Sequence, residues 1–301
     1  RLWALQPRET ITIASDAGKL VIPGSVEGLA RILAEEPTAT IVAGSTDVGL
    51  WVTKQMRSLT PVVFINHLSE LQAIKVTEGG VTFGAGVTYT KAFEVLAKKV
   101  PALAGLINRI GGEQVRNMGT IGGNIANGSP PLIALGATVK LRSAAGTRML
   151  RLEDYFIAYG RQDRKAGEFV ESVFVPYPAE GTHFAVYKIT KRRDEDITAV
   201  LGAFYLTLDD NGDVHDIRIA FGGMAGIPKR ARTVESDLLG KPWTEATIDA
   251  ARGTFDADFQ PLSDWRATAE YRQLTARNLL TRFYLETVGT PVELKRFEGV
   301  A

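Results

Sequence analysis

The segment that most constrains the fold is residues 116–130, which read Arg-Asn-Met-Gly-Thr-Ile-Gly-Gly-Asn-Ile-Ala-Asn-Gly-Ser-Pro. Its fifteen residues contain four glycines and three asparagines and show almost no apolar periodicity. We therefore expect neither a helix nor a core strand here. Glycines accept positive φ and let the backbone approach a ligand closely. The composition predicts a long ligand-binding loop; the alternative is a surface loop without a ligand.

A second glycine-containing segment lies earlier in the chain, at residues 40–51. A short apolar strand, residues 41–43, runs into Gly44-Ser45-Thr46-Asp47 and then into a predicted helical turn. Backbone N–H groups at such a corner point outward together and can form a nest for a phosphate. Neither the Gly-Lys-Ser/Thr of a Walker loop nor a complete G-x-G-x-x-G fingerprint is present. The pattern favours a phosphate site outside these two common motifs.

Composition narrows the function classes. The 301 residues carry 35 Lys and Arg against 34 Asp and Glu, a net charge of +1, which argues against binding nucleic acid or membrane surfaces through bulk charge. The absence of cysteine excludes disulfides, cysteine nucleophiles and cysteine-held zinc or iron–sulfur clusters in this chain. The three histidines are far apart and lack metal-ligand spacing, so we expect no metal site. No apolar run approaches the roughly 20 residues of a membrane span.

The ends of the chain lead to two further expectations. No secretory leader is visible, which with the lack of cysteine favours a cytoplasmic protein. The first residue is Arg1 rather than Met, which predicts a chain that lacks its natural start.

Apolar patterning predicts two domains, residues 1–180 and 181–301, the first with lobes at about 1–66 and 67–180. In the first lobe we expect a helix at 26–35 capped by Ser25 and strands at 10–13, 19–23, 41–43 and 62–66. In the second lobe we expect helices at 89–99 and 101–110 and strands at 73–77, 81–85, 137–142, 147–150 and 169–175. In the second domain we expect strands at 184–190, 199–208 and 214–221, then helices at 232–239, 244–258 and 265–288.

Four segments, in order, resemble the flavin-binding subunits of molybdenum hydroxylases. Residues 41–47 and 120–130 are similar to the two pyrophosphate loops of that family. Residues 188–197, Lys-Ile-Thr-Lys-Arg-Arg-Asp-Glu-Asp-Ile, resemble the strand and basic–acidic loop beside the flavin. Residues 220–231 are similar to the Gly-Gly-Met-Ala turn of the C-terminal domain. The resemblance covers about residues 8–290 and is most specific to the FAD domain of xanthine dehydrogenases.

The resemblance implies an α+β fold: a two-lobed FAD-binding domain of the vanillyl-alcohol-oxidase type, then a smaller three-stranded α+β domain. It places the FAD pyrophosphate against residues 43–47 and 120–124. Ile110 takes a position near the flavin ring that is usually aromatic, Val170 supplies an apolar contact, and Lys188 brings a positive charge to the flavin and nicotinamide. The implied cofactor-binding residues are Val42, Ala43, Gly44, Ser45, Thr46, Asp47, Ile110, Thr120, Ile121, Gly122, Gly123, Asn124, Val170 and Lys188.

The function that the resemblance implies is electron transfer in xanthine dehydrogenase, within purine catabolism. FAD would take electrons from 2Fe–2S clusters and pass a hydride to NAD⁺. Molybdopterin and the 2Fe–2S clusters would lie on partner subunits or other segments, in a higher oligomer of heteromers. Alternatives are the flavin subunit of a carbon monoxide dehydrogenase or an aromatic-acyl-CoA reductase, and a flavin-free structural subunit of the same fold.

Two features leave alternatives open. Ser129-Pro130 runs directly into Pro131, without the aspartate that the family usually places near the flavin, so we assign no acidic residue there. This junction and Ile110 are the best support for a flavin-free subunit. Lys188 could be a surface lysine on a strand, and residues 191–196 could be a solvated charged turn.

Overall fold

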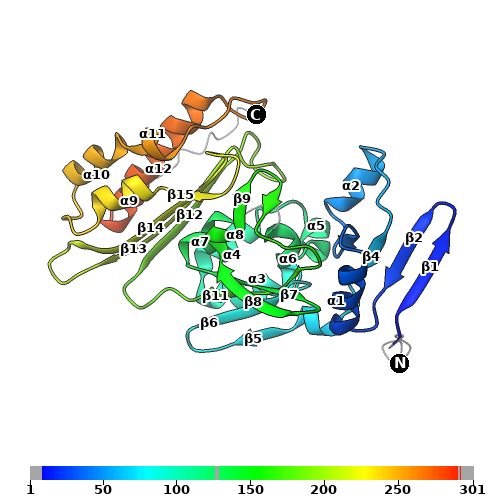
Figure 1. The fold of residues 1–301 in the computed structure, drawn as a ribbon. Helices are drawn as coiled ribbons and strands as arrows, with labels where there is room; N and C mark the ends of the chain where they lie inside the picture. The colour runs from blue at the N-terminus through cyan, green and yellow to red at the C-terminus, as the bar shows by residue number, and fades with distance from the viewer. Residues whose placement is uncertain (1–8, 126–128, 291, 293–301) are drawn as a thin grey trace, which may run out of the picture. The chain divides into compact units, whose positions relative to one another are not determined.

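The structure is a computed structural model that describes residues 9–125, 129–290 and 292 (Figure 1). The chain forms two compact units. Unit 1 comprises the residues up to Pro178 together with Arg192–Ile197, and unit 2 comprises Ala179–Lys191 and the residues from Thr198 onward.

The first sheet of unit 1 has the strand order β1-β2-β4-β3. Its strands are β1 (Ile11–Ser15), β2 (Gly18–Ile22), β3 (Thr40–Val42) and β4 (Val62–Phe64). β1 and β2 form an antiparallel hairpin, whereas β4 runs parallel to both β2 and β3. Helix α1 (Val26–Glu35) begins as predicted, because the Ser25 hydroxyl accepts a hydrogen bond from the Gly28 N–H at 3.0 Å. Its buried face, with Leu29 and Leu33, packs in one core cluster with Val63 of β4.

The second sheet of unit 1 is antiparallel, with the order β5-β6-β11-β7-β8. Its strands are β5 (Ile74–Val76), β6 (Gly80–Gly84), β7 (Thr138–Ser143), β8 (Gly146–Arg151) and β11 (Phe169–Pro176). The shorter elements are η2 (Ser69–Gln72), α8 (Leu152–Tyr155), β9 (Phe156–Ala158) and β10 (Arg161–Gln162). The other helices of the unit are α2 (Val48–Thr53), α3 (Tyr89–Lys99), α4 (Pro101–Ile107), α5 (Glu113–Met118), α6 (Ile121–Ile125) and α7 (Pro130–Ala134).

The glycine-rich segment is more helical than its composition predicts. Most of its described residues lie in α5, α6 and α7, so the expectation of a segment without helix was wrong. The sequence contains one helical signal that we missed, an apolar pair at helical spacing. Ile121 and Ile125 stand one turn apart and are both buried. Gly119 ends α5 in an extended conformation, which keeps the helices short. Residues 126–128 lie outside the described part of the chain.

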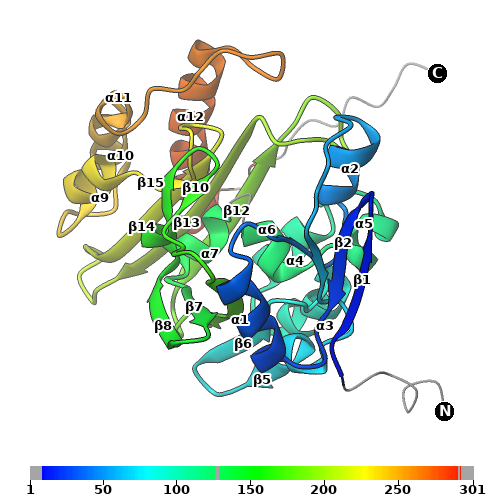
Figure 2. The ribbon, with the colours of Figure 1, turned by 45° about the vertical axis from the view of Figure 1, so that its right-hand side comes forward.

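Unit 2 is built on an antiparallel sheet in the order β12-β13-β14-β15. Its elements are β12 (His183–Ile189), β13 (Val200–Leu208), β14 (Val214–Gly222), β15 (Lys229–Arg230), α9 (Arg232–Leu238), α10 (Glu245–Arg252), α11 (Phe255–Asp258) and α12 (Ala269–Thr287). Figures 1 and 2 show the helices covering one face of the sheet. A cluster of aromatic rings, with Phe204, Phe221 and Phe283 each at most 1% exposed, fills the space between.

Three expectations for unit 2 need correction. The sheet has a fourth strand, the two-residue β15, because Lys229 and Arg230 pair with β14. The helix expected over 244–258 is divided into α10 and α11 by Gly253 and Thr254. The last helix begins at Ala269 rather than at Trp265, because the Thr268 hydroxyl caps it by accepting from the Tyr271 N–H at 3.2 Å.

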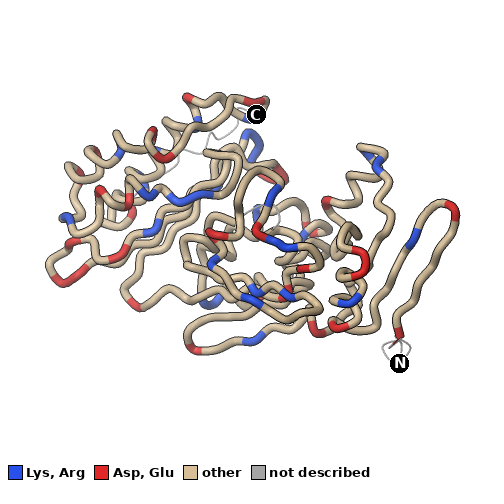
Figure 3. The backbone as a smooth tube through the Cα atoms, viewed as in Figure 1, with Lys and Arg blue, Asp and Glu red and all other residues tan. Residues whose placement is uncertain are grey.

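Charged residues of both signs are interspersed along the chain (Figure 3). In the described part of the chain, no helix combines the length and the apolar character that crossing a membrane requires.

Candidate functional site

The two glycine-containing segments meet in unit 1. Gly44, at the end of β3, packs against the chain where α5 ends: a Cβ added to Gly44 would overlap the Met118 carbonyl and lie 3.1 Å from the Gly119 Cα. Figures 1 and 2 both show α2, which follows Gly44, near α5. We call residues 44–47 and 118–124 the cradle. Two segments far apart in sequence thus meet at Gly44 and Gly119.

The first segment of the cradle offers backbone donors. Among the described residues, no acceptor binds the backbone N–H groups of residues 44–47. Ser45 has a φ of 62°, the left-handed conformation that lets successive N–H groups face the same side. Ser45, Thr46 and Asp47 are exposed, whereas Gly44 is buried, so residues 45–47 are the part of this segment that lies at the surface. This geometry suits a phosphate group.

The second segment of the cradle has fewer open donors than the sequence suggested. The Ile121 N–H donates to Val87 O at 2.8 Å, the Gly122 N–H to Ala85 O at 2.9 Å and the Asn124 N–H to Thr120 O at 2.9 Å. The Gly123 N–H donates to the Thr120 hydroxyl at 3.1 Å. The segment therefore contributes close backbone approach and the side chains of Thr120 and Asn124, while most open N–H groups belong to residues 44–47.

Two backbone hydrogen bonds link the chain next to Val170 to the second segment of the cradle. The Gly122 N–H donates to Ala85 O, and the Ala85 N–H donates to the carbonyl of Glu171, the residue after Val170. Val170 sits at an irregularity of β11, where the register against β7 shifts between Val170 and Ser172. Bulges of this kind redirect a side chain. The structure thus connects the β11 residue that follows Val170 to the second segment of the cradle through the Ala85 backbone.

Ile110 lies in a turn between α4 and α5. It is partly buried, and Gly111 beside it has a φ of 50°. The Arg116 guanidinium donates to three carbonyls of this turn, Gly111 O at 2.7 Å and Asn108 O and Ile110 O at 3.2 Å each. Sequence reasoning named Ile110 but missed Arg116 and Met118. Both belong to the glycine-rich segment 116–130, but only their contacts in the structure identify them as part of the site.

Tyr89 was also missed. Its buried ring packs beside the cradle, because a Cβ added to Gly119 would lie 3.2 Å from that ring. Burial raises the pKa of the Tyr89 hydroxyl, which therefore stays protonated at neutral pH. This hydroxyl finds no hydrogen-bond partner among the described residues.

Lys188 belongs to unit 2 and is not part of the cradle within unit 1. It lies on β12 opposite Leu201 of β13 and is partly buried. The basic–acidic run after it is divided between the units, because Arg192–Ile197 belongs to unit 1. There the Arg109 guanidinium donates to the Arg193 carbonyl at 3.4 Å, which holds the run against the Ile110 turn.

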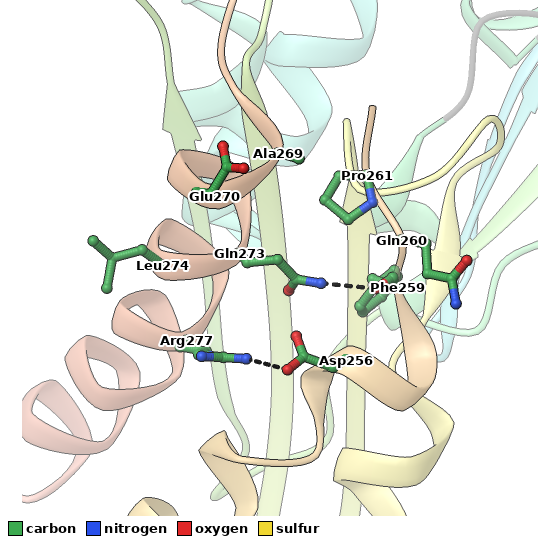
Figure 4. Close-up of a pocket in the computed structure, with 9 residues that line it drawn as sticks. All are labelled: Asp256, Phe259, Gln260, Pro261, Ala269, Glu270, Gln273, Leu274 and Arg277. Atoms are coloured by element: carbon green, nitrogen blue, oxygen red, sulfur yellow. Dashed lines mark hydrogen bonds and ion pairs between the residues drawn. The ribbon is translucent and has the colours of Figure 1, made fainter. Parts of the chain in front are cut away.

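Unit 2 has a hollow of about 560 Å³ between α12 and the chain that follows α11 (Figure 4). Gln273 reaches across it to the Phe259 carbonyl at 2.7 Å, and Arg277 pairs with Asp256 at 2.6 Å. None of the residues that we predicted for the site lines this hollow.

Comparison with known protein families gives two matches. Residues 15–178 match the family described as "FAD binding domain in molybdopterin dehydrogenase". Residues 185–287 match "CO dehydrogenase flavoprotein C-terminal domain".

Two curated relatives cover most of the chain. The "Xanthine dehydrogenase FAD-binding subunit" of Escherichia coli O157:H7 is 29% identical, over 86% of this chain and 91% of its own length. The "Glyceraldehyde dehydrogenase medium chain" of Sulfolobus acidocaldarius is 33% identical, over 77% of this chain and 85% of its own length.

Solved structures agree in fold. A chain of the carbon monoxide dehydrogenase from Hydrogenophaga pseudoflava is 27% identical with a TM-score of 0.82, over 90% of this chain and 96% of its own. A chain of quinoline 2-oxidoreductase from Pseudomonas putida 86 is 28% identical with a TM-score of 0.78, over 89% of this chain and 96% of its own. These likenesses confirm the predicted fold class, an FAD-binding α+β fold followed by a smaller α+β domain.

Proposed function

This chain belongs to the family of FAD binding domains in molybdopterin dehydrogenases, and from that membership we propose that it is the FAD-carrying electron-transfer part of a xanthine dehydrogenase, with NAD⁺ as the acceptor. The observation that carries the proposal is the cradle. Two glycine-containing segments touch, and the backbone N–H groups of residues 44–47 have no acceptor among the described residues. A pyrophosphate carries negative charge and needs this kind of donor set.

We assign residues to two parts of FAD, the pyrophosphate and the flavin ring. Residues 44–47 would hold the pyrophosphate, with Thr120 and Asn124 beside it. Ile110 and Val170 would supply apolar contacts for the flavin ring. When bound, FAD supplies the hydride transfer to the acceptor, and the protein contributes binding, orientation and electrostatics. The backbone of the chain thus carries most of the proposed recognition of the phosphates.

Gly44 supports this proposal through its packing. The sequence alone predicts a nest for a phosphate at this corner, in which a side chain at position 44 would be expected to enter the space of the phosphate. In the structure it would first meet the Met118 carbonyl. Gly44 therefore keeps the two segments of the cradle in contact, and a side chain there would open the cradle rather than fill it.

The relatives support a proposal for the substrate and the partners of the enzyme. The chain has no cysteine and cannot ligate 2Fe–2S clusters, so we propose that these clusters and molybdopterin lie on partner subunits or other segments. The Escherichia coli relative favours xanthine dehydrogenase, whereas the Hydrogenophaga structure keeps carbon monoxide dehydrogenase as the alternative. The molybdenum subunit that copurifies with the chain from its natural source distinguishes the two.

The first prediction tests the cradle. Gly44→Ala should weaken FAD binding roughly tenfold or more, because moving the two segments apart costs on the order of 1–3 kcal/mol. The measurement is flavin released on denaturation, together with an FAD titration of the apoprotein. The matched control is Gly105→Ala on α4, where an added Cβ meets no atom within 4 Å. The control should bind FAD like the parent.

Two outcomes would count against the proposal. A parent protein that carries no flavin, even after reconstitution with FAD, supports the alternative of a flavin-free structural subunit. A Gly44→Ala variant that binds FAD as tightly as the Gly105→Ala control shows that the cradle does not hold the cofactor.

A further inference from the structure

The turn that carries Ile110 is joined to the cradle by one short helix. α5 begins at Glu113, just after the turn, and ends at Met118, whose carbonyl contacts Gly44. None of its six residues is buried. A helix this short is marginal by itself, and its apolar side chains are only partly covered, with Val115 38% and Met118 47% exposed. Polar contacts therefore contribute to holding α5 relative to the turn.

Arg116 provides that link. Its Nη1 atom lies within hydrogen-bond distance of the carbonyls of Asn108, Ile110 and Gly111. Three carbonyl dipoles that converge on one point repel each other unless a cation lies between them. Arg116 is partly buried, so these bonds are less weakened by water than those of an exposed arginine. The guanidinium therefore clamps the turn to the middle of α5.

Gly111 sets the shape that Arg116 holds. Its φ is 50°, and a Cβ added to it would lie 2.8 Å from the Val115 Cβ. The turn therefore folds back tightly on α5, and its carbonyls face the Arg116 side chain. Glycine permits this conformation, while the charged hydrogen bonds from Arg116 stabilise it.

We propose that Arg116 is a positioning residue that fixes Ile110 at a set distance from the cradle, and so places the flavin ring relative to its pyrophosphate. The inference rests on the proposed function. Arg116 reaches the ring only through Ile110 and the turn. Its positive charge also offsets the three carbonyls beside the ring position, which raises the midpoint potential of a bound flavin.

The test compares three variants loaded with FAD. Arg116→Met removes every donor and the charge, and should weaken FAD binding about tenfold, the effect of losing one well-placed charged hydrogen-bond group. It should also shift the visible absorption bands of the flavin and lower its midpoint potential. Arg116→Lys keeps a charge and donors, and should restore part of each change. The control is Arg148→Met, which removes a multiply bonded guanidinium elsewhere in unit 1.

The outcomes separate this inference from the proposed function. The control should lose thermal stability while its flavin bands, midpoint potential and FAD affinity stay like those of the parent. If Arg116→Met also keeps all three parental values, the positioning role is wrong while the FAD function stands. A parent that never binds FAD removes the proposed function, and this inference with it. Should Arg116→Met fail to fold, Arg116→Gln takes its place, because it keeps hydrogen-bond donors but has no charge. The same changes in FAD affinity, flavin bands and midpoint potential are expected, and parental values for all three would again overturn the positioning role.

Discussion

At the scale of single residues, Arg148 makes the most extensive set of charged bonds in the described part of unit 1. Its guanidinium donates to both carboxylate oxygens of Glu168, at 2.7 and 2.8 Å, and to Asp163 Oδ2 at 3.1 Å. The Glu168 side chain is only 8% exposed. Arg148 therefore ties β8 to the chain that leads into β11.

The stability of this clasp should depend on pH. The Arg148 hydrogen bond is the main cause that holds the pKa of Glu168 below its ordinary value of 4.5, against the opposing effect of burial. A lowered folded-state pKa adds stability that is present above pH 4.5 and is lost as the pH falls through the folded value. The clasp thus stabilises the protein at neutral pH and weakens in acid.

Arg148→Met should lower the free energy of unfolding at pH 7 by about 2 kcal/mol, because it leaves the buried Glu168 carboxylate without its charged partner. The difference from the parent should narrow as the pH is lowered below 4.5, where Glu168 becomes protonated. Urea unfolding at a series of pH values measures both effects. A difference that stays constant from pH 7 to pH 3 contradicts this account.

At the scale of elements, helix α9 is capped by a residue from another helix. Its own N-cap, Ala231, has no side chain that can accept a hydrogen bond. The Asp258 carboxylate of α11 accepts from the Thr233 N–H at 2.9 Å and the Val234 N–H at 3.1 Å, and from the Thr233 hydroxyl at 2.9 Å. A carboxylate at a helix N-terminus satisfies open donors and complements the helix dipole. The cap thus fixes α11 to α9.

Asp258→Ala should therefore lower the free energy of unfolding by about 1–2 kcal/mol, the usual effect of losing a cap. The control on the same short helix is Asp256→Ala. Asp256 forms an ion pair with Arg277, but its side chain is 64% exposed, so its loss should change stability by less than about 1 kcal/mol. Urea unfolding of the two variants compares them directly. Equal losses would show that Asp258 does not act as a cap.

Elements that are determined by neighbouring residues in the sequence were predicted correctly. The Ser25 cap, the 3.6-residue pattern of α1 and the alternation in β11 were all readable from the sequence. Contacts between separate elements were not: the Asp258 cap exists only because α11 packs against α9, and β15 only because two residues pair with the end of β14. The same holds for the candidate site. Both segments of the cradle could be identified in the sequence, whereas the contact between Gly44 and Met118 could not.

At the scale of the whole molecule, the chain carries balanced charge and no cysteine, and its sequence matches two families in succession. The cradle, Ile110 and Val170 belong to unit 1, whereas Lys188 belongs to unit 2. The sequence resemblance implies that Lys188 brings a positive charge to the flavin and nicotinamide. The proposed role of Lys188 can therefore be tested separately from FAD binding.

Lys188→Met should leave the FAD content unchanged but slow NADH oxidation by an artificial dye on the order of tenfold, the factor that about 1.4 kcal/mol of lost charge stabilisation gives. The midpoint potential of the flavin should fall as well, because a positive charge favours the reduced cofactor. The control is Lys241→Met, which removes an exposed lysine of the same unit. It should match the parent in the rate of NADH oxidation and in the midpoint potential of the flavin. If Lys188→Met also matches the parent in NADH kinetics and in potential, Lys188 is only a lysine of strand β12. Xanthine turnover by this chain alone would contradict the broader proposal, because the purine chemistry is expected on a partner.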